Sequence, residues 1–255
     1  MAESFNENKG SEWESFDEQQ SEKLGEYDER IIDALFEPTQ KILEELRPEI
    51  EGKTYQLVIG DDASGRLPAL LIWQTLRELA EKKETLRPQV RFIAGTRHYS
   101  KEGPVGMKKK HKVLEYIQGL KKDIPDLRRV LIVTDTIASG QSLEPLAQSL
   151  REVGVEYDIA TIALMNNQQG VEQKLSGRVI AGGTWRDDSV YMKYHLGGVV
   201  KDIQDLHARR NIHSKHEQRI VNATREEITH LAHQLAKEFS KKEQGEKYPD
   251  ERMAA

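Results

Sequence analysis

Four short apolar runs alternate with segments of helical period, and this alternation constrains the fold more than any other feature of the sequence. The runs are TYQLVIG (54–60), QVRFIAG (89–95), RRVLIVTD (128–135) and VEYDIATIALMN (155–166). Strands that are separated by helices pair in parallel, because each helix returns the chain to the same end of the sheet. We therefore expect an α/β fold with a mainly parallel sheet flanked by helices.

Apolar residues at helical spacing lie before and between these runs. The first such segment covers residues 29–46, and we expect Pro38 to kink or divide it and Pro48 to lie just past its end. Residues 113–120 are expected to form a short helix, after a polar, lysine-rich loop. SLEPLAQSLREVG (142–154) predicts a third helix whose C-terminal cap is its final glycine.

The C-terminal part of the chain predicts a further strand and a long helix. RVIAGG (178–183) is a short β-rich run. Thr224 and Glu227 have the spacing of a capping box, which predicts that a helix begins there. Beyond it, one apolar face is formed by Ile228, Leu231, Leu235 and Phe239. This face predicts an amphipathic helix that docks on the domain.

Composition divides the chain into four parts. Residues 1–27 are acidic and poor in aliphatic side chains, which is typical of a disordered tail. Residues 28–200 carry the strand and helix pattern and are expected to form one α/β domain. Residues 201–240 are expected to be a helical C-terminal extension, and residues 241–255 a loose tail.

The overall composition excludes several classes of protein. The net charge of −5 argues against a chain that binds nucleic acid over its whole surface. The absence of cysteine excludes disulfides, thiolate metal sites and cysteine nucleophiles. The N-terminus lacks the features of a signal peptide, and no apolar run approaches the roughly 20 residues needed to cross a bilayer. We expect a cytoplasmic protein, and the sequence leaves open whether it forms a homo-oligomer.

The third run leads into a loop suited to an anion. VLIVTDTIASGQSL (130–143) passes from a strand through small, hydroxylated residues directly into a helix. The five loop residues are Ala138, Ser139, Gly140, Gln141 and Ser142. Backbone N–H groups and the positive end of the helix dipole favour phosphate there, and Gly140 allows close approach. Asp135 could accept hydrogen bonds from sugar hydroxyls. An ordinary strand-to-helix turn with hydroxyl caps would have the same local pattern.

The same stretch resembles the phosphoribosyl-pyrophosphate motif of type I phosphoribosyltransferases, with four apolar residues, an acidic position and a small-residue loop. The resemblance implies that residues 138–142 wrap the 5′-phosphate and that Asp135 faces the ribose hydroxyls. It covers about residues 54–166, and its elements follow the order of the family. It implies a phosphoribosyltransferase-like fold with helical extensions at both ends.

LVIGDDASGRLPALL (57–71) resembles the pyrophosphate loop of that family, which also follows a strand and precedes a helix. The resemblance implies that Ala63, Ser64, Gly65 and Arg66 approach the pyrophosphate. Arg66 would offer a forked, permanently charged donor. Taken alone, the segment fits equally well a solvent-exposed arginine at a helix start.

The lysine-rich loop after FIAGTR corresponds to a mobile, often basic loop that closes over the pyrophosphate in family members. Its basic residues are Lys101, Lys108, Lys109 and Lys110. By this resemblance Lys109 is a candidate catalytic residue, because exclusion of water would strengthen its charge. Charged loops are more often simply solvated.

The sequence departs from the family at two positions of the motif. The family usually has two adjacent acids, whereas here the first position is Thr134, which can bond a ribose hydroxyl but brings no negative charge. Ala138 stands where some purine-salvage members carry an aspartate that acts on the base.

The acceptor site is less defined: Trp185 and Tyr191 could stack on a base or fill the core. Asp187 and Asp188 could read a base or be solvated.

Three functions compete. The first is a transferase that moves phosphoribose to a nitrogen acceptor such as a nucleobase, with Mg²⁺ carried by the pyrophosphate and no dedicated metal ligands in the chain. The second is a non-catalytic module that senses phosphoribosyl pyrophosphate or a nucleotide, which Thr134 favours. The third is a nucleic-acid contact through the basic, histidine-rich segment 207–219, for which a solvated helix face is the favoured reading.

Overall fold

The computed structural model describes residues 32–61, 63–82, 87–93, 104–165, 167–184, 198–200 and 206–245. Its centre is a sheet of five parallel strands in the order β2-β1-β3-β4-β5. The strands are β1 (Leu57–Asp61), β2 (Gln89–Ile93), β3 (Arg129–Ile137), β4 (Glu156–Leu164) and β5 (Arg178–Ala181). The expected α/β class and parallel sheet are thus confirmed.

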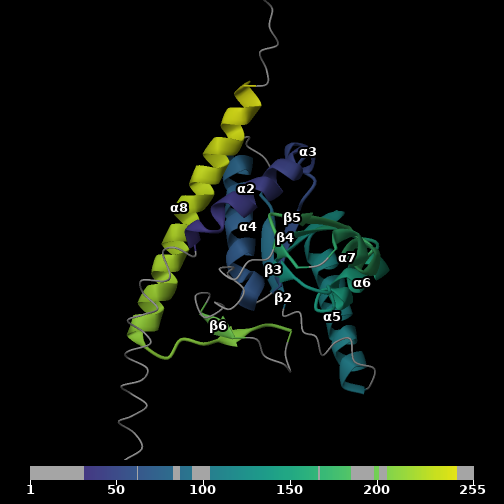
Figure 1. The fold of residues 1–255 in the computed structure, drawn as a ribbon. Helices are drawn as coiled ribbons and strands as arrows, with labels where there is room; N and C mark the ends of the chain where they lie inside the picture. The colour runs from purple at the N-terminus through teal and green to yellow at the C-terminus, as the bar shows by residue number, and fades with distance from the viewer. Residues whose placement is uncertain are drawn as a thin grey trace, which may run out of the picture.

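Helices cover both faces of this sheet (Figure 1). One face carries α2 (Phe36–Glu45), α4 (Arg66–Lys82) and α8 (Lys215–Gly245). The other face carries α5 (Pro104–Asp123), α6 (Glu144–Glu152) and α7 (Gln168–Leu175). The short helix α3 (Arg47–Glu51) follows α2. The fold therefore has three layers, helices–sheet–helices.

Two hydrophobic cores form because alternate residues of each strand face opposite layers. Val58, Leu131 and Ala160 belong to the core beneath α2, α4 and α8. Leu57 and Ile132 belong to the core beneath α5, α6 and α7. All five residues of β1 are buried, as expected for a strand that is paired on both sides and covered on both faces.

The helix α5 is longer than expected and corrects the prediction of a lysine-rich loop. It begins at Pro104, so residues 104–112 are helical and only the part before them lies outside the described residues. Proline suits the first position of a helix, and lysine loses little side-chain freedom in one. The apolar residues Val113, Ile117 and Leu120 anchor its second half in the core.

Two helix boundaries near proline were also tested. Pro38 lies in the first turn of α2, after a turn at residues 34–35, so the expected division of this segment is confirmed. Pro48 lies just past the end of α2, as expected, and falls in the first turn of the next helix, α3. A proline fits there because the N–H group that it lacks has no partner in the first turn of a helix.

The helix α8 begins at Lys215, nine residues before Thr224, and the predicted capping box was wrong. Thr224 is buried inside the helix. The box is formed instead by Ser214 and Glu217: the Glu217 N–H donates to Ser214 Oγ over 3.1 Å, and the Ser214 N–H donates to Glu217 Oε2 over 3.3 Å. The predicted apolar face is confirmed, because Ile228, Leu231, Leu235 and Phe239 are all buried.

A short antiparallel ribbon precedes α8. It pairs β6 (Val199–Val200) with β7 (Arg209–Arg210) and lies at the N-terminal end of α8 (Figure 1). Only residues 215–219 of the basic segment 207–219 are helical. None of the described helices has the length and hydropathy needed to cross a membrane.

Candidate functional site

The order in which successive strands are added to the sheet reverses between β1 and β3, a point that we call the chain reversal. Both predicted ligand loops begin there. From β1 the chain leaves to α4 on one face of the sheet, whereas from β3 it leaves to α6 on the other face. In open sheets with this strand order, ligands bind in the crevice outside the carboxyl ends of the two strands that flank the reversal. The topology therefore brings the segments 63–66 and 138–142 to one edge of the sheet.

The loop 138–142 turns sharply at Gly140. This glycine is buried and has a φ of +72°, and a Cβ atom there would lie 3.2 Å from carbon atoms of Leu175. Its carbonyl accepts hydrogen bonds from the N–H groups of Leu143 (3.0 Å) and Glu144 (3.2 Å). Both the backbone conformation and the packing thus require glycine at this position.

The polar side chains of the same loop face outward to different degrees. Ser139 and Gln141 are exposed, and Ser142 and Ala138 are partly buried. No side chain caps the N-terminus of α6, whose cap residue is Leu143. The hydroxyl caps that an ordinary strand-to-helix turn would use are therefore not present at this helix.

Asp135 and Thr134 lie at the carboxyl end of β3 beside Asp61, the last residue of β1. All three are buried. Gly60 is paired with Val133, so Asp61 and Thr134 occupy the next position along each strand. The Thr134 Oγ1 lies 3.4 Å from Asp61 Oδ2 and 3.4 Å from Asp135 Oδ1, and Asp135 Oδ1 also accepts from the Thr136 N–H over 2.7 Å.

The segment 63–65 forms a 3₁₀ turn that packs onto the ends of both strands. A Cβ atom at Gly65 would lie 2.9 Å from the Val133 carbonyl oxygen and 3.0 Å from Thr134 Cα, so only glycine fits. Ala63 has a φ of +41°, which is unusual for a residue with a side chain, and Ser64 is partly buried. The structure thus gives Gly65 a packing role that its sequence pattern did not indicate.

Arg66 is the first residue of α4 and lies over β2. Its guanidinium carbon is 4.2 Å from the ring centre of Phe92, which faces Gly60 in the register of β1 and β2. Arg66 therefore lies on one side of β1, and the loop 138–142 lies beyond β3 on the other side. Asp61, Thr134 and Asp135 occupy the positions between them.

Lys109 lies on the helix α5 and not on a loop, and the position of its side chain is outside the described structure. Other predicted site residues lie outside the described residues altogether: Lys101, Trp185, Asp187, Asp188 and Tyr191. The proposed closing loop and the acceptor site thus remain predictions. Asp61 was not predicted as a site residue, although it directly follows the first apolar run and precedes the glycine turn.

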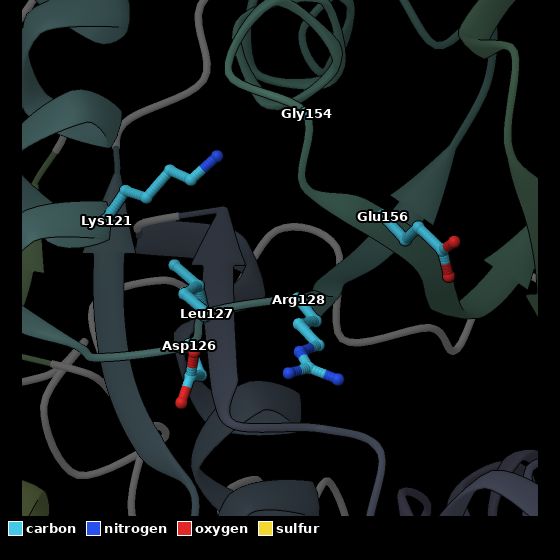
Figure 2. Close-up of a pocket in the computed structure, with 6 residues that line it drawn as sticks. All are labelled: Lys121, Asp126, Leu127, Arg128, Gly154 and Glu156. Carbon is cyan, nitrogen blue, oxygen red and sulfur yellow. The ribbon is translucent and has the colours of Figure 1, made fainter.

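A pocket of about 540 Å³ lies at the opposite edge of the sheet, between the C-terminal end of α5 and the first residues of β3 and β4 (Figure 2). Its lining residues are Lys121, Asp126, Leu127, Arg128, Gly154 and Glu156. Lys121 Nζ donates to the Val153 carbonyl, so this ammonium group already has a partner. The pocket is distant from the chain reversal and contains no predicted site residue.

A buried ion pair also lies at that opposite edge. Arg129 Nε and Nη2 donate to the two carboxylate oxygens of Asp158 over 2.8 and 3.1 Å, and the Tyr55 hydroxyl donates to Asp158 Oδ2 over 2.6 Å. Burial, followed by the hydrogen bond to Asp158, raises the pKa of Tyr55. The hydrogen bond to Asp158 also raises the pKa of Arg129. Tyr55, Arg129 and Asp158 thus connect the N-terminal ends of β1, β3 and β4, and we assign them a structural role.

His207, the first residue of the segment 207–219, lies near the carboxyl edge. His207 Nδ1 lies 2.9 Å from the Phe92 carbonyl oxygen, and its ring meets the Tyr116 ring edge-on at 5.2 Å. Because a carbonyl only accepts, Nδ1 carries the proton in this contact. Arg209, Arg210 and Arg219 are exposed.

No protein-family model matches the chain, and no curated protein matches it.

Proposed function

We propose that the protein binds 5-phosphoribosyl pyrophosphate or a related nucleotide and transfers phosphoribose to a nitrogen acceptor such as a nucleobase. The observation that carries this proposal is the position of Asp61, Thr134 and Asp135 between two glycine-containing turns at the chain reversal. Carboxylates accept hydrogen bonds from sugar hydroxyls, and turns at helix starts favour phosphate. A ribose with a phosphate group on either side suits this order of groups.

The spacing of the strands supports the same ligand. Arg66 lies over β2, Asp61 ends β1, and Asp135 lies near the end of β3. Neighbouring strands are about 4.8 Å apart, so these three positions span about 10 Å. An extended ligand could place its pyrophosphate toward Arg66, its ribose at Asp135 and its 5-phosphate at the loop 138–142.

The backbone of the 5-phosphate loop limits which groups can bind the anion. The N–H groups of Leu143 and Glu144 donate inward to the Gly140 carbonyl. The candidate donors are the N–H groups of residues 139–142 and the hydroxyls of Ser139 and Ser142. A phosphate bound there would still lie at the positive end of the α6 dipole.

Mg²⁺ is the cation that this ligand class carries, and oxygen donors near the chain reversal suit it. Asp61 and Asp135 offer hard carboxylate oxygens. Among the described residues, no group of three or more histidine, cysteine, aspartate or glutamate side chains could hold a metal. Most ligands of the ion would therefore be pyrophosphate oxygens and water. Its chemical contribution would be to neutralise the charge of the leaving pyrophosphate.

The transfer itself needs little covalent chemistry from the protein. A lone pair of the acceptor nitrogen forms a bond to ribose C1, and the bond from C1 to the pyrophosphate oxygen breaks with its electron pair. Arg66 would stabilise the charge that develops on the pyrophosphate, and Asp135 would orient the ribose. Lys109 would add to the same stabilisation if the first turns of α5 face the ligand.

Calorimetric titration with 5-phosphoribosyl pyrophosphate and Mg²⁺, followed by an assay of pyrophosphate release with a set of nucleobases, tests the proposal. Binding with release for at least one base supports the transferase. Binding without release for any base supports the sensing module instead. Absence of binding overturns both.

A further inference from the structure

The second carboxylate that the family motif usually carries is absent at position 134, and the structure brings another acid to that place. Asp61 ends β1 directly beside Thr134 in the parallel register, because the preceding residues Gly60 and Val133 are paired. The Asp61 Oδ2 lies 3.4 Å from Thr134 Oγ1, and Asp135 Oδ1 lies 3.4 Å from the same oxygen. Two carboxylates thus flank one hydroxyl, although they come from different strands.

We propose that Asp61 supplies the missing carboxylate and that, together with Asp135, it accepts hydrogen bonds from the two neighbouring hydroxyls of the ribose. This inference rests on the proposed function, because it assigns a residue to the ribose part of that site. It also explains how the site could do without a second acid at position 134: the negative charge would be kept but supplied from β1 by Asp61 and not from β3.

Packing holds Asp61 in this place. Its neighbour Gly65 lies so close that a Cβ atom there would be 3.4 Å from Asp61 Cβ and 3.0 Å from Thr134 Cα. Both strands are buried and paired, so the two carboxylates have little freedom to move apart. A site built on two strands of a sheet holds its groups more firmly than one built on a loop.

The electrostatics favour a ligand that donates hydrogen bonds. Asp61 and Asp135 are both buried, and like charges in a site of low hydration disfavour each other. Hydroxyl groups that donate to both would stabilise their charged forms, and hydrogen bonds to charged groups are among the strong ones. A cationic ribosyl transition state would be stabilised by the same two charges.

The test measures binding of ribose 5-phosphate by calorimetry to the unmodified chain, to Asp61→Asn and to Asp123→Asn. Asp123 is exposed at the end of α5 and serves as a control for the same chemical change. We expect Asp61→Asn to weaken binding about 10-fold or more and Asp123→Asn to leave it unchanged. The decisive variant is Asp61→Asn combined with Thr134→Asp, which returns the charge to β3 and should restore most of the affinity.

Each outcome bears on one proposal. If the unmodified chain binds and Asp61→Asn binds equally well, the inference is wrong and the proposed function stands. If Asp61→Asn weakens binding but Thr134→Asp does not restore it, Asp61 has only a structural role. The unmodified chain must also prefer ribose 5-phosphate over 2-deoxyribose 5-phosphate, and equal affinity for both would overturn the inference without any variant. No binding of either sugar phosphate, or of 5-phosphoribosyl pyrophosphate, would overturn the proposed function itself.

Discussion

The guanidinium of Arg66 lies on the ring of Phe92, with its central carbon 4.2 Å from the ring centre. The same ring packs closely on Gly60, where a Cβ atom would lie 2.7 Å from Phe92 Cδ1. The ring is therefore held against the backbone of the neighbouring strand. Because we propose Arg66 as the cation that binds the pyrophosphate, Phe92 has the geometry of a residue that positions this guanidinium.

Replacing Phe92 with leucine should weaken the binding of inorganic pyrophosphate about 2- to 5-fold, because the guanidinium loses its aromatic support. Phe92→Trp, which keeps an aromatic face, should retain more of the affinity. Calorimetric titration of both variants with pyrophosphate and with ribose 5-phosphate separates positioning from general damage. A loss of equal size for both ligands would contradict the role of Phe92.

The same contact predicts a stability difference between two glycines. A Cβ atom at Gly60 would lie within 2.9 Å of Phe92 and Ala69 atoms, whereas one at Gly119, inside α5, would meet nothing within 4 Å. Gly60→Ala should lower the free energy of unfolding by about 1–3 kcal/mol through overpacking. Gly119→Ala should raise it by about 0.5–1 kcal/mol, since alanine favours the helix. Urea denaturation of both variants gives the two values, and equal effects would contradict the packing described.

The layers of the fold could be predicted because their signal is local. The runs that form β1, β3 and β4 are buried almost throughout, so they need no polar alternation, and most of the helices show their own period. The register that places Asp61 beside Thr134 is a different kind of property. It depends on which strands become neighbours, and β1 pairs with β3 although a helix, a strand and another helix separate them in the sequence. No local pattern of residues carries that information.

The errors at the helix ends have the same origin. Thr224 and Glu227 match a capping box as well as Ser214 and Glu217 do, and only the burial of Thr224 against the domain decides between the two pairs. Polar lysines before Val113 read as a loop, yet they continue a helix that the apolar face of its second half anchors. Local propensity is a weak guide where tertiary packing determines how far a helix extends.

The phosphate loop can be tested with a matched pair of glycines. Gly140 and Gly154 have φ angles of +72° and +68°, so the backbone strain of alanine should cost each about 1–2 kcal/mol of stability, to which the contact with Leu175 adds at position 140. Only Gly140 lies in the loop at the carboxyl edge, whereas Gly154 lines the pocket at the other edge. We expect Gly140→Ala to weaken binding of ribose 5-phosphate at least about 10-fold and Gly154→Ala to leave it unchanged. Calorimetry on both folded variants measures the two affinities. An equal loss of affinity in both variants would mean that the ligand does not bind at the loop 138–142.

The contact between Tyr55 and Asp158 predicts how stability depends on pH. Burial and the hydrogen bond to Asp158 raise the pKa of Tyr55 above its ordinary value of 10.0, so the folded chain keeps this proton at a pH where the unfolded chain loses it. The stabilisation is therefore complete below pH 10 and is lost as the pH rises beyond it. Tyr116 and Tyr157, whose pKa values burial also raises, contribute to the same loss.

Tyr55→Phe isolates the contribution of this hydroxyl, because Tyr116 and Tyr157 remain in both proteins. At pH 8 the variant should be less stable by about 1–3 kcal/mol, since a buried hydrogen bond to a charged group is lost. The difference in the free energy of unfolding between the two proteins should shrink as the pH rises from 10 to 11. Tyr55 then ionises in the unfolded chain, which stabilises the unfolded state of the unmodified protein but not that of Tyr55→Phe. Urea denaturation at each pH measures this difference. A difference that stays constant up to pH 11 would mean that Asp158 does not hold the phenol in its neutral form.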